Sequence, residues 1–186
     1  MKTLIINGSP RKNGATASII SKVQKSLHGE VTIVNTYFPH VSPCMDCRNC
    51  WTNASCAIND EMQNIYKAID ETDNIIIASP IYFAELTGSL LSFASRFQFL
   101  WTAKEFRKEN VLKDKLRYGV VILVDGGDGY VDTALAMGKR LLRTMGAEFK
   151  KLIYFSGTDK TESASPLDNN EMKQSIKELS DLFNRT

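Results

Sequence analysis

The sequence predicts a doubly wound α/β fold, in which helices cover both faces of a five-stranded parallel sheet. Short apolar runs rich in β-branched residues alternate along the chain with longer segments whose apolar residues have helical spacing. The run from Asn74 to Ser79 is apolar almost throughout, as the central strands of parallel sheets are. Strands that alternate with helices are joined by right-handed crossovers and so form a parallel sheet.

Five short segments are predicted to be strands. Each is too short for a helix and is bounded by glycine, proline or polar residues. Pro80, which cannot donate a backbone hydrogen bond, is expected to end the third strand. The predicted strands span Thr3 to Asn7, Glu30 to Asn35, Asn74 to Ser79, Tyr118 to Val124 and Lys151 to Phe155.

Five helices are predicted between and after these strands. In the first, Ile19, Ile20, Val23 and Leu27 share one face, and the last is also amphipathic. The third is unusually aromatic, and core packing accounts for most of its rings, although its aromatic face also suits packing in a dimer. The predicted helices span about Thr16 to Leu27, Asp60 to Asp70, Gly88 to Trp101, Val131 to Met145 and Asn169 to Phe183.

The length and the net charge of the chain limit the classes of function that it can have. At 186 residues the chain fits one domain, residues 1–186, and its net charge of +2 comes from basic residues interspersed with acids. This pattern gives no support to binding of nucleic acid or of an anionic membrane. The amino terminus enters a strand at once, and no apolar stretch approaches the length of a membrane span. A cytoplasmic protein is therefore expected.

The segment between the first strand and the first helix, residues 8–16, has the features of an anion site. Gly8 and Gly14 can take positive φ angles, and the helix that follows aims its free N–H groups into the loop. The spacing fits neither a nucleotide-hydrolysing P-loop nor a dinucleotide fingerprint. A terminal phosphate such as that of FMN fits better, and the alternative is an ordinary strand-to-helix turn. The candidate donors are Ser9, Arg11, Asn13 and Thr16.

Two further strand ends are predicted to meet this loop at the carboxyl edge of the sheet, where ligands bind in such folds. After the third strand, Pro80-Ile81-Tyr82-Phe83 offers a rigid turn and a flat apolar and aromatic surface. After the fourth, the segment from Asp125 to Tyr130 contains three glycines, whose backbone can approach a planar ring. Together they suit an isoalloxazine ring, and the alternative for Ile81, Tyr82 and Phe83 is core packing.

All four cysteines lie in a polar, proline-containing excursion at about residues 36–59, with the spacing Cys44-x2-Cys47-x2-Cys50-x5-Cys56. In a reduced compartment such a run indicates metal ligation before disulfides. Three thiols at two-residue intervals suit a four-iron, four-sulfide cluster. Zinc is an alternative, although it usually takes two cysteine pairs separated by a longer loop. The remaining alternative is a remnant motif whose thiols stay free or form disulfides.

These motifs resemble the NADPH-dependent FMN reductase and iron-sulfur flavoprotein family, whose fold is flavodoxin-like. The resemblance rests on residues 8–14, on residues 79–83 with Thr87-Gly88, and on the cysteine run. It implies a phosphate site, a ring site and a glycine loop at the other edge of the ring. The FMN-binding residues that follow are Ser9, Arg11, Asn13, Gly14, Ala15, Thr16, Pro80, Ile81, Tyr82, Phe83, Gly126 and Gly127.

The same resemblance implies NAD(P)H as co-substrate, a homodimer or tetramer, and one cluster on the four cysteines. The chain has Leu91 where the family often has Lys, and Ser95-Arg96 where an Asp-Arg pair is common. These positions are expected to face away from the phosphate loop. They therefore bear on contacts between subunits rather than on flavin binding.

The sequence thus predicts an FMN-binding oxidoreductase that moves electrons between a nicotinamide or ferredoxin donor and a small-molecule or protein acceptor. The alternatives are a non-catalytic electron carrier and a zinc- or thiol-based redox sensor on the same scaffold. Because a flavin carries out the chemistry itself, no catalytic acid or base is required, and His28 and His40 are interpreted as surface residues. The sequence does not distinguish NADH from NADPH.

Overall fold

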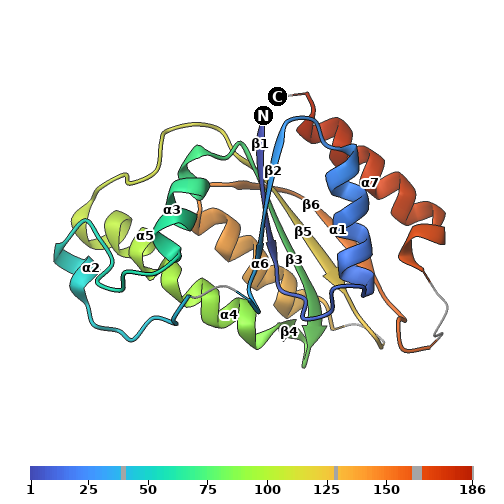
Figure 1. The fold of residues 1–186 in the computed structure, drawn as a ribbon, viewed down its shortest axis with the longest axis horizontal. Coiled ribbons are helices and arrows are strands. Elements are labelled where there is room, and N and C mark those ends of the chain that lie inside the picture. Colours follow the sequence, from blue (N-terminus) through green and yellow to red (C-terminus); the bar gives the residue numbers. More distant parts are fainter. Residues whose placement is uncertain (39–40, 128–129, 161–164, 186) are drawn as a thin grey trace.

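The computed structural model describes residues 1–38, 41–127, 130–160 and 165–185, and a parallel sheet lies at its centre (Figure 1). The five parallel strands lie in the order β2-β1-β3-β5-β6, so the direction of winding reverses between β1 and β3. The predicted doubly wound, flavodoxin-like fold is confirmed. The strands are β1 Lys2–Asn7, β2 Glu30–Asn35, β3 Asn74–Tyr82, β5 Tyr118–Val124 and β6 Glu148–Phe155.

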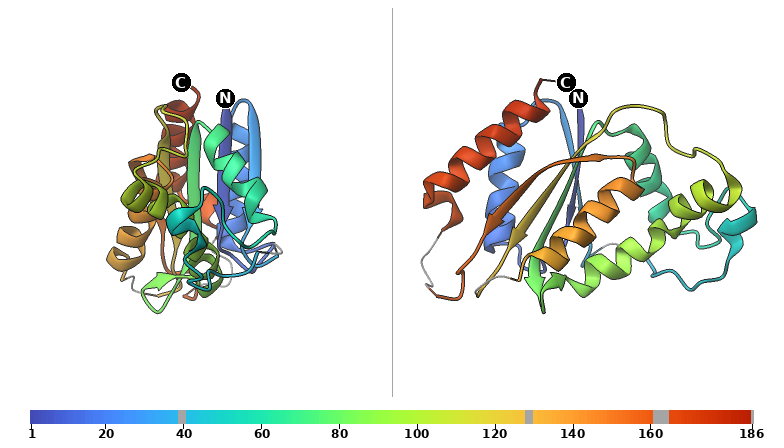
Figure 2. Two further views of the ribbon diagram at one scale, coloured as in Figure 1. Left: turned by 90° about the vertical axis from the view of Figure 1, so that its left-hand side faces the viewer. Right: turned by 180° about the vertical axis from the view of Figure 1, so that it is seen from behind.

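Helices cover both faces of the sheet (Figures 1 and 2). Buried apolar side chains form one cluster on the face covered by α1 and α7, and a second on the face covered by α3, α4 and α6. No helix in the described part of the chain is long and apolar enough to span a membrane. The helices outside the aromatic segment are α1 Ala15–Ser26, α2 Asn49–Thr52, α3 Met62–Glu71, α6 Asp132–Thr144, α7 Asn170–Phe183 and the 3-10 turn η3 Pro166–Asp168.

The third strand is longer than predicted. β3 continues through Pro80, which still pairs with β5, and then pairs antiparallel with the two-residue strand β4, Glu85–Leu86. Phe83 and Ala84 form the turn between β3 and β4, with φ angles of 52° and 63°. The prediction that Pro80 ends the strand was wrong. Proline lacks only its backbone N–H, and the hairpin is formed by Ile81 and Tyr82, so the strand continues past Pro80.

The aromatic helix predicted from Gly88 to Trp101 is also longer, and it is irregular. Its apolar side chains Leu90, Phe93, Phe97 and Leu100 are buried as expected, whereas Trp101 is half exposed. The helical pitch changes twice, and a π-helical turn follows where the prediction ended. The successive parts are α4 Gly88–Ala94, the 3-10 turn η1 Ser95–Phe97, α5 Gln98–Thr102 and the π-helical η2 Ala103–Arg107.

The cysteine-containing segment lies at one end of the molecule (Figures 1 and 2). Its short helix α2 packs against α5 and η2, while α1 and α7 lie at the opposite end. The second half of the aromatic segment therefore leaves the sheet and supports the cysteines. Of the surface and loop predictions, those on His40, Asp128 and Gly129 fall outside the described residues.

Candidate functional site

A cleft of about 340 Å³ lies at the carboxyl edge of the sheet. The carboxyl end of β3 and the loops that follow β1, β5 and β6 all reach it, as the topology requires for a doubly wound sheet. Asn13 and Phe83 are predicted site residues that do not line it. The predicted residues that line it are Ser9, Arg11, Gly14, Ala15, Thr16, Pro80, Ile81, Tyr82, Gly126 and Gly127.

The loop after β1 is held in shape by Asn7, the last residue of that strand. The Asn7 side chain accepts a hydrogen bond from the Ser9 N–H at 3.0 Å and donates one to the Asn35 side chain at 2.7 Å. The hydroxyl oxygen of Ser9 in turn accepts a hydrogen bond from the Arg11 N–H at 3.3 Å. These bonds fix the loop without using the side chain of Arg11.

The amino terminus of α1 opens into the cleft without a cap. Gly14 is the N-cap residue and provides no side-chain hydrogen bond, so the N–H groups of the first turn lack the partners that a capping side chain would supply. Thr16 is only 2% exposed, yet its hydroxyl has no hydrogen-bond partner among the described residues, and the Arg11 guanidinium has none either. Uncapped N–H groups, a free hydroxyl and a free cation fit a phosphate.

Neither glycine of this loop uses a positive φ angle, which corrects the expectation from the sequence. Gly14 has a φ of −86°, and the glycines with positive φ in the described ranges are Gly29, Gly146 and Gly157. Gly8 is instead required by close packing, because a Cβ there would lie 3.1 Å from Leu90 and from the Ser79 hydroxyl.

The carboxyl end of β3 provides the exposed apolar wall of the cleft. Tyr82 is 44% exposed and Ile81 and Pro80 are partly exposed, so the core-packing alternative does not apply to Tyr82. Phe83 is fully exposed and points to solvent from the β3–β4 turn rather than into the cleft. A ring is thus available to a flat ligand from Tyr82 but not from Phe83.

The sequence prediction missed the loop after β6, which closes the cleft through Thr158 and Asp159. The Thr158 N–H donates to the Asp125 carbonyl and the Asp159 N–H donates to the Gly126 carbonyl, each at 3.2 Å. A Cβ on Gly126 would lie 2.1 Å from the Asp159 carboxylate. Two features of the sequence could have indicated that this loop reaches the cleft: it follows the last predicted parallel strand, and it contains Gly157.

Gly126→Ala is expected to displace Asp159 and weaken flavin binding. The free energy of unfolding should fall by less than about 1 kcal/mol, because the carboxylate of Asp159 is exposed and can turn away from the added methyl group. For the free energy of unfolding, Gly127→Ala is the matched control, because no atom lies within 4 Å of a Cβ at that position. Chemical denaturation of both variants measures this effect, and flavin titration measures the affinity of Gly126→Ala. Equal stability of the two variants would contradict a close contact at Gly126.

The four cysteines are free and line one small pocket of about 30 Å³, together with Arg96 and Phe99. Within the described ranges, no three His, Cys, Asp or Glu side chains lie close enough to hold a single metal ion. A cubane cluster places its ligands on different irons, and four soft thiols around one pocket are the donor set that such a cluster requires. The residues therefore fit a cluster in chemistry.

The aromatic segment holds this cysteine loop at several points. The Cys44 N–H donates to the Ser95 hydroxyl at 2.9 Å. The Cys50 carbonyl accepts from the Thr102 hydroxyl at 3.1 Å and from the Arg107 guanidinium. The π-helical turn η2 thus brings Arg107 back to the cysteines, which a regular helix ending at Trp101 would not do.

Arg96 corrects a further expectation, since it does not face a subunit contact. Its side chain is completely buried and forms an ion pair with Asp60 at 2.7 Å. Burial opposes ionisation of Asp60, but hydrogen bonds from Arg96 and from the N–H groups of Ser42 and Met62 hold its pKa below the ordinary value of 3.8. Leu91, the other departure from the family pattern, is partly buried against the core.

Asp60→Asn is expected to reduce stability at neutral pH by about 1 to 2 kcal/mol, because a buried guanidinium loses its carboxylate. Since the folded state lowers the pKa of Asp60, its contribution is fully present above about 3.8 and is lost as the pH falls through the lowered value. The variant should therefore show less loss of stability on acidification than the parent. Asp46→Asn, at an exposed pair with Arg48, is the control. Parallel acid-denaturation curves for parent and Asp60→Asn would contradict this.

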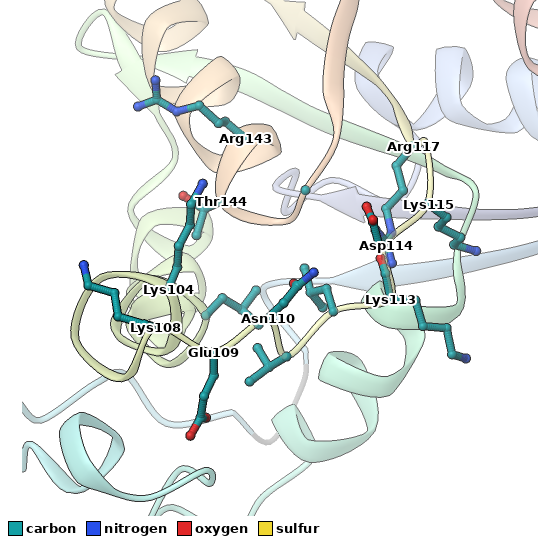
Figure 3. A pocket seen from close by; sticks show the side chains of 14 residues that line it. Lys104, Lys108, Glu109, Asn110, Lys113, Asp114, Lys115, Arg117, Arg143 and Thr144 are labelled. Carbon is teal, nitrogen blue, oxygen red and sulfur yellow. The ribbon is translucent and has the colours of Figure 1, made fainter.

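A second hollow, of about 440 Å³, lies at the amino end of β5 and is lined by several charged residues (Figure 3). Two of its lysines form ion pairs: Lys113 lies 3.4 Å from Asp70, and Lys115 lies 2.8 Å from Asp73. Arg117 is buried and donates to the Asp70 carbonyl at 2.8 Å. This hollow is at the edge of the sheet opposite the cleft and offers no wall for a flavin ring.

Comparisons with known proteins agree on one family. Residues 1–167 match the model of the family described as NADPH-dependent FMN reductase. An iron-sulfur flavoprotein of Archaeoglobus fulgidus is 28% identical over 149 residues, which cover 78% of this chain and 64% of that protein. Another from Clostridioides difficile is 31% identical over 147 residues, which cover 72% and 65%. The chain thus spans slightly less than two thirds of the length of these relatives.

Solved structures share the fold at lower identity. The NAD(P)H:quinone oxidoreductase from Methanothermobacter marburgensis has a TM-score of 0.70 and 14% identity, with 96% of each chain covered. An FMN-dependent NADH-azoreductase from Bacillus anthracis, in complex with FMN, has a TM-score of 0.62 and 19% identity, with 96% of this chain and 99% of that chain covered. At these identities the likeness concerns the fold.

Proposed function

Because the chain belongs to the NADPH-dependent FMN reductase family, we propose that it binds FMN in the carboxyl-edge cleft and oxidises NAD(P)H. The observation that carries this proposal is the uncapped amino terminus of α1, beside the partnerless side chains of Thr16 and Arg11. A phosphomonoester dianion could accept hydrogen bonds from all of these donors at once.

The residues of the cleft then have separate tasks. Arg11, Thr16 and the first-turn N–H groups of α1 bind the phosphate, while Ser9 shapes the loop. Pro80 and Tyr82 cover one side of the ring and exclude water, and the backbone of Gly126 and Gly127 borders its edge. When bound, the flavin accepts a hydride and passes electrons on singly or in pairs. No side chain of this chain is assigned a catalytic proton transfer.

We further propose that Cys44, Cys47, Cys50 and Cys56 hold one four-iron, four-sulfide cluster. The names of the relatives and the common pocket of the four thiols support this. The cysteine segment and α1 lie at opposite ends of the molecule (Figures 1 and 2), which favours electron exchange between copies in a dimer or tetramer over exchange within one chain. The acceptor is a small molecule or a ferredoxin-type protein.

The test is an anaerobic flavin titration followed by addition of NADH or NADPH. We expect one FMN per chain and loss of the oxidised flavin spectrum with at least one of the two nucleotides. Flavin that binds but is reduced only by a protein donor would favour the non-catalytic carrier. Protein that binds no flavin would overturn the proposal, and the redox sensor would then be the better interpretation.

Tyr82→Ala is expected to lower flavin affinity and to raise the flavin reduction potential, since a ring against the isoalloxazine disfavours its electron-rich reduced form. Because Tyr82 is already half exposed, the free energy of unfolding should change by less than about 1 kcal/mol. Phe83→Ala, which removes a fully exposed ring outside the cleft, should leave both quantities unchanged. Redox titration and denaturation are the measurements. A large loss of stability with an unchanged flavin potential would contradict a contact of Tyr82 with the flavin and support the core-packing alternative.

A further inference from the structure

Arg96 is a completely buried cation within an aromatic helical segment, where no amphipathic pattern calls for one. Its guanidinium donates to Asp60 at 2.7 Å and to the carbonyls of Ser42 at 2.9 Å and Ile58 at 3.2 Å. These partners lie just before the first cysteine and just after the last one. Arg96 therefore joins the two ends of the cysteine loop.

A fourth contact of Arg96 reaches a cysteine sulfur. The NH2 nitrogen lies 3.4 Å from Sγ of Cys56, within hydrogen-bonding distance for sulfur. In the part of the chain that the structure describes, Cys56 is the one cysteine whose sulfur accepts a hydrogen bond. The contact is therefore specific to one of the four thiols, although Arg96 lines the pocket that all four share.

One donor of Arg96 remains unused. Its Nε is buried and has no partner among the described residues. A buried N–H without an acceptor costs free energy. Thiolate and sulfide are acceptors of the kind that such a donor requires.

We propose that Arg96 is a positioning residue of the cysteine site, which directs Sγ of Cys56 into the pocket and stabilises the bound cluster by hydrogen bonding to its sulfur. This inference rests on the proposed cluster. Because Asp60 offsets the full charge of Arg96, the hydrogen bond rather than net charge carries the effect to the sulfur. Hydrogen bonds to ligand sulfur favour the more negative, reduced state of a cluster, so Arg96 raises its reduction potential.

Arg96→Lys separates this role from simple bracing of the loop. Lysine keeps the charge and can still pair with Asp60, but its single ammonium group cannot also reproduce the planar contacts to Cys56 and both carbonyls. A purely structural Arg96 predicts a change in stability alone. A positioning Arg96 predicts a change in the properties of the cluster in folded protein.

The experiment uses the full chain, made without oxygen and loaded with ferrous and ferric iron and sulfide. In competition with a chelator, Arg96→Lys and Arg96→Gln should have an apparent affinity for iron about ten- to hundredfold lower than that of the parent. The reduction potential of their cluster should also be more negative. Their FMN affinity should be unchanged. Two control variants each remove one positive charge elsewhere. Arg48→Gln removes an exposed arginine that lines the same pocket. Arg117→Gln removes a buried arginine outside this pocket, next to the amino end of β5.

The decisive comparison is between the cluster in folded Arg96→Lys and the cluster in the parent. An unchanged potential together with an unchanged chelator resistance in folded Arg96→Lys would overturn the inference and leave the cluster standing. A parent protein that takes up no iron would overturn the cluster and this inference together, while the FMN titration would still report on the cleft.

Discussion

Cys50→Ser is expected to abolish stable iron binding while FMN stays bound. Anaerobic parent protein should contain about four irons per chain, and serine replaces a soft thiolate by a hydroxyl that iron-sulfur clusters accept poorly. The Cys50 carbonyl is held by Thr102 and Arg107, and these bonds do not involve the sulfur. The substitution therefore removes a ligand while the loop keeps its anchors. Iron and sulfide analysis, with flavin absorbance in the same sample, measures both outcomes.

Met45→Leu is the matched control for Cys50→Ser, because Met45 is a highly exposed residue of the same loop and its thioether is no ligand in the proposed site. It should keep both iron and FMN. Anaerobic parent protein with one FMN, no iron and four titrating thiols would contradict the cluster. Stoichiometric zinc in place of iron would instead support the zinc alternative, which the spacing of the cysteines left open.

Much of the fold could be predicted because it depends on local apolar pattern. The central strands β3 and β5 are almost uniformly apolar and β1 has an apolar centre, Leu4 to Ile6, so the apolar pattern predicts all three. The edge strand β6 begins at Glu148, three residues before the predicted Lys151, because one edge of it is unpaired and its exposed positions tolerate charge. The hairpin to β4 could not be predicted, since two residues carry no periodicity.

Most residues that line the cleft between β1 and α1 could be predicted for a related reason: they lie close together in sequence and precede a helix terminus. The contact of Asp159 with Gly126 could not be predicted, because it joins two loops that come together only when β5 and β6 pair in the folded sheet. Arg96 was misplaced on the surface because arginine is rarely fully buried. Its partners Asp60 and Cys56 lie about 40 residues away along the chain, so nothing near Arg96 in sequence signals the ion pair.

Arg11→Ala and Thr16→Val are each expected to weaken FMN binding by about 1.5 to 3 kcal/mol, or tenfold or more, without unfolding the protein. Arg11 is exposed at the cleft and has no partner in the described chain, so its loss breaks no bond of the free protein. The hydroxyl of Thr16 is likewise partnerless, and valine keeps its shape within the helix. Flavin titration gives the affinities, and denaturation checks that stability is retained.

Two neighbouring residues separate the phosphate contact from general charge and helix effects. Lys12→Ala removes the next positive charge, which lies 5.4 Å above the Phe38 ring and does not line the cleft. Ser18→Ala removes a hydroxyl that bonds the Gly14 carbonyl one turn further along α1. Both controls should bind FMN nearly as the parent does, because neither Lys12 nor Ser18 lines the cleft. Equal weakening by Lys12→Ala and Arg11→Ala would mean that only overall charge attracts the flavin. Unchanged FMN affinity in both Arg11→Ala and Thr16→Val would contradict binding of the phosphate at the amino terminus of α1.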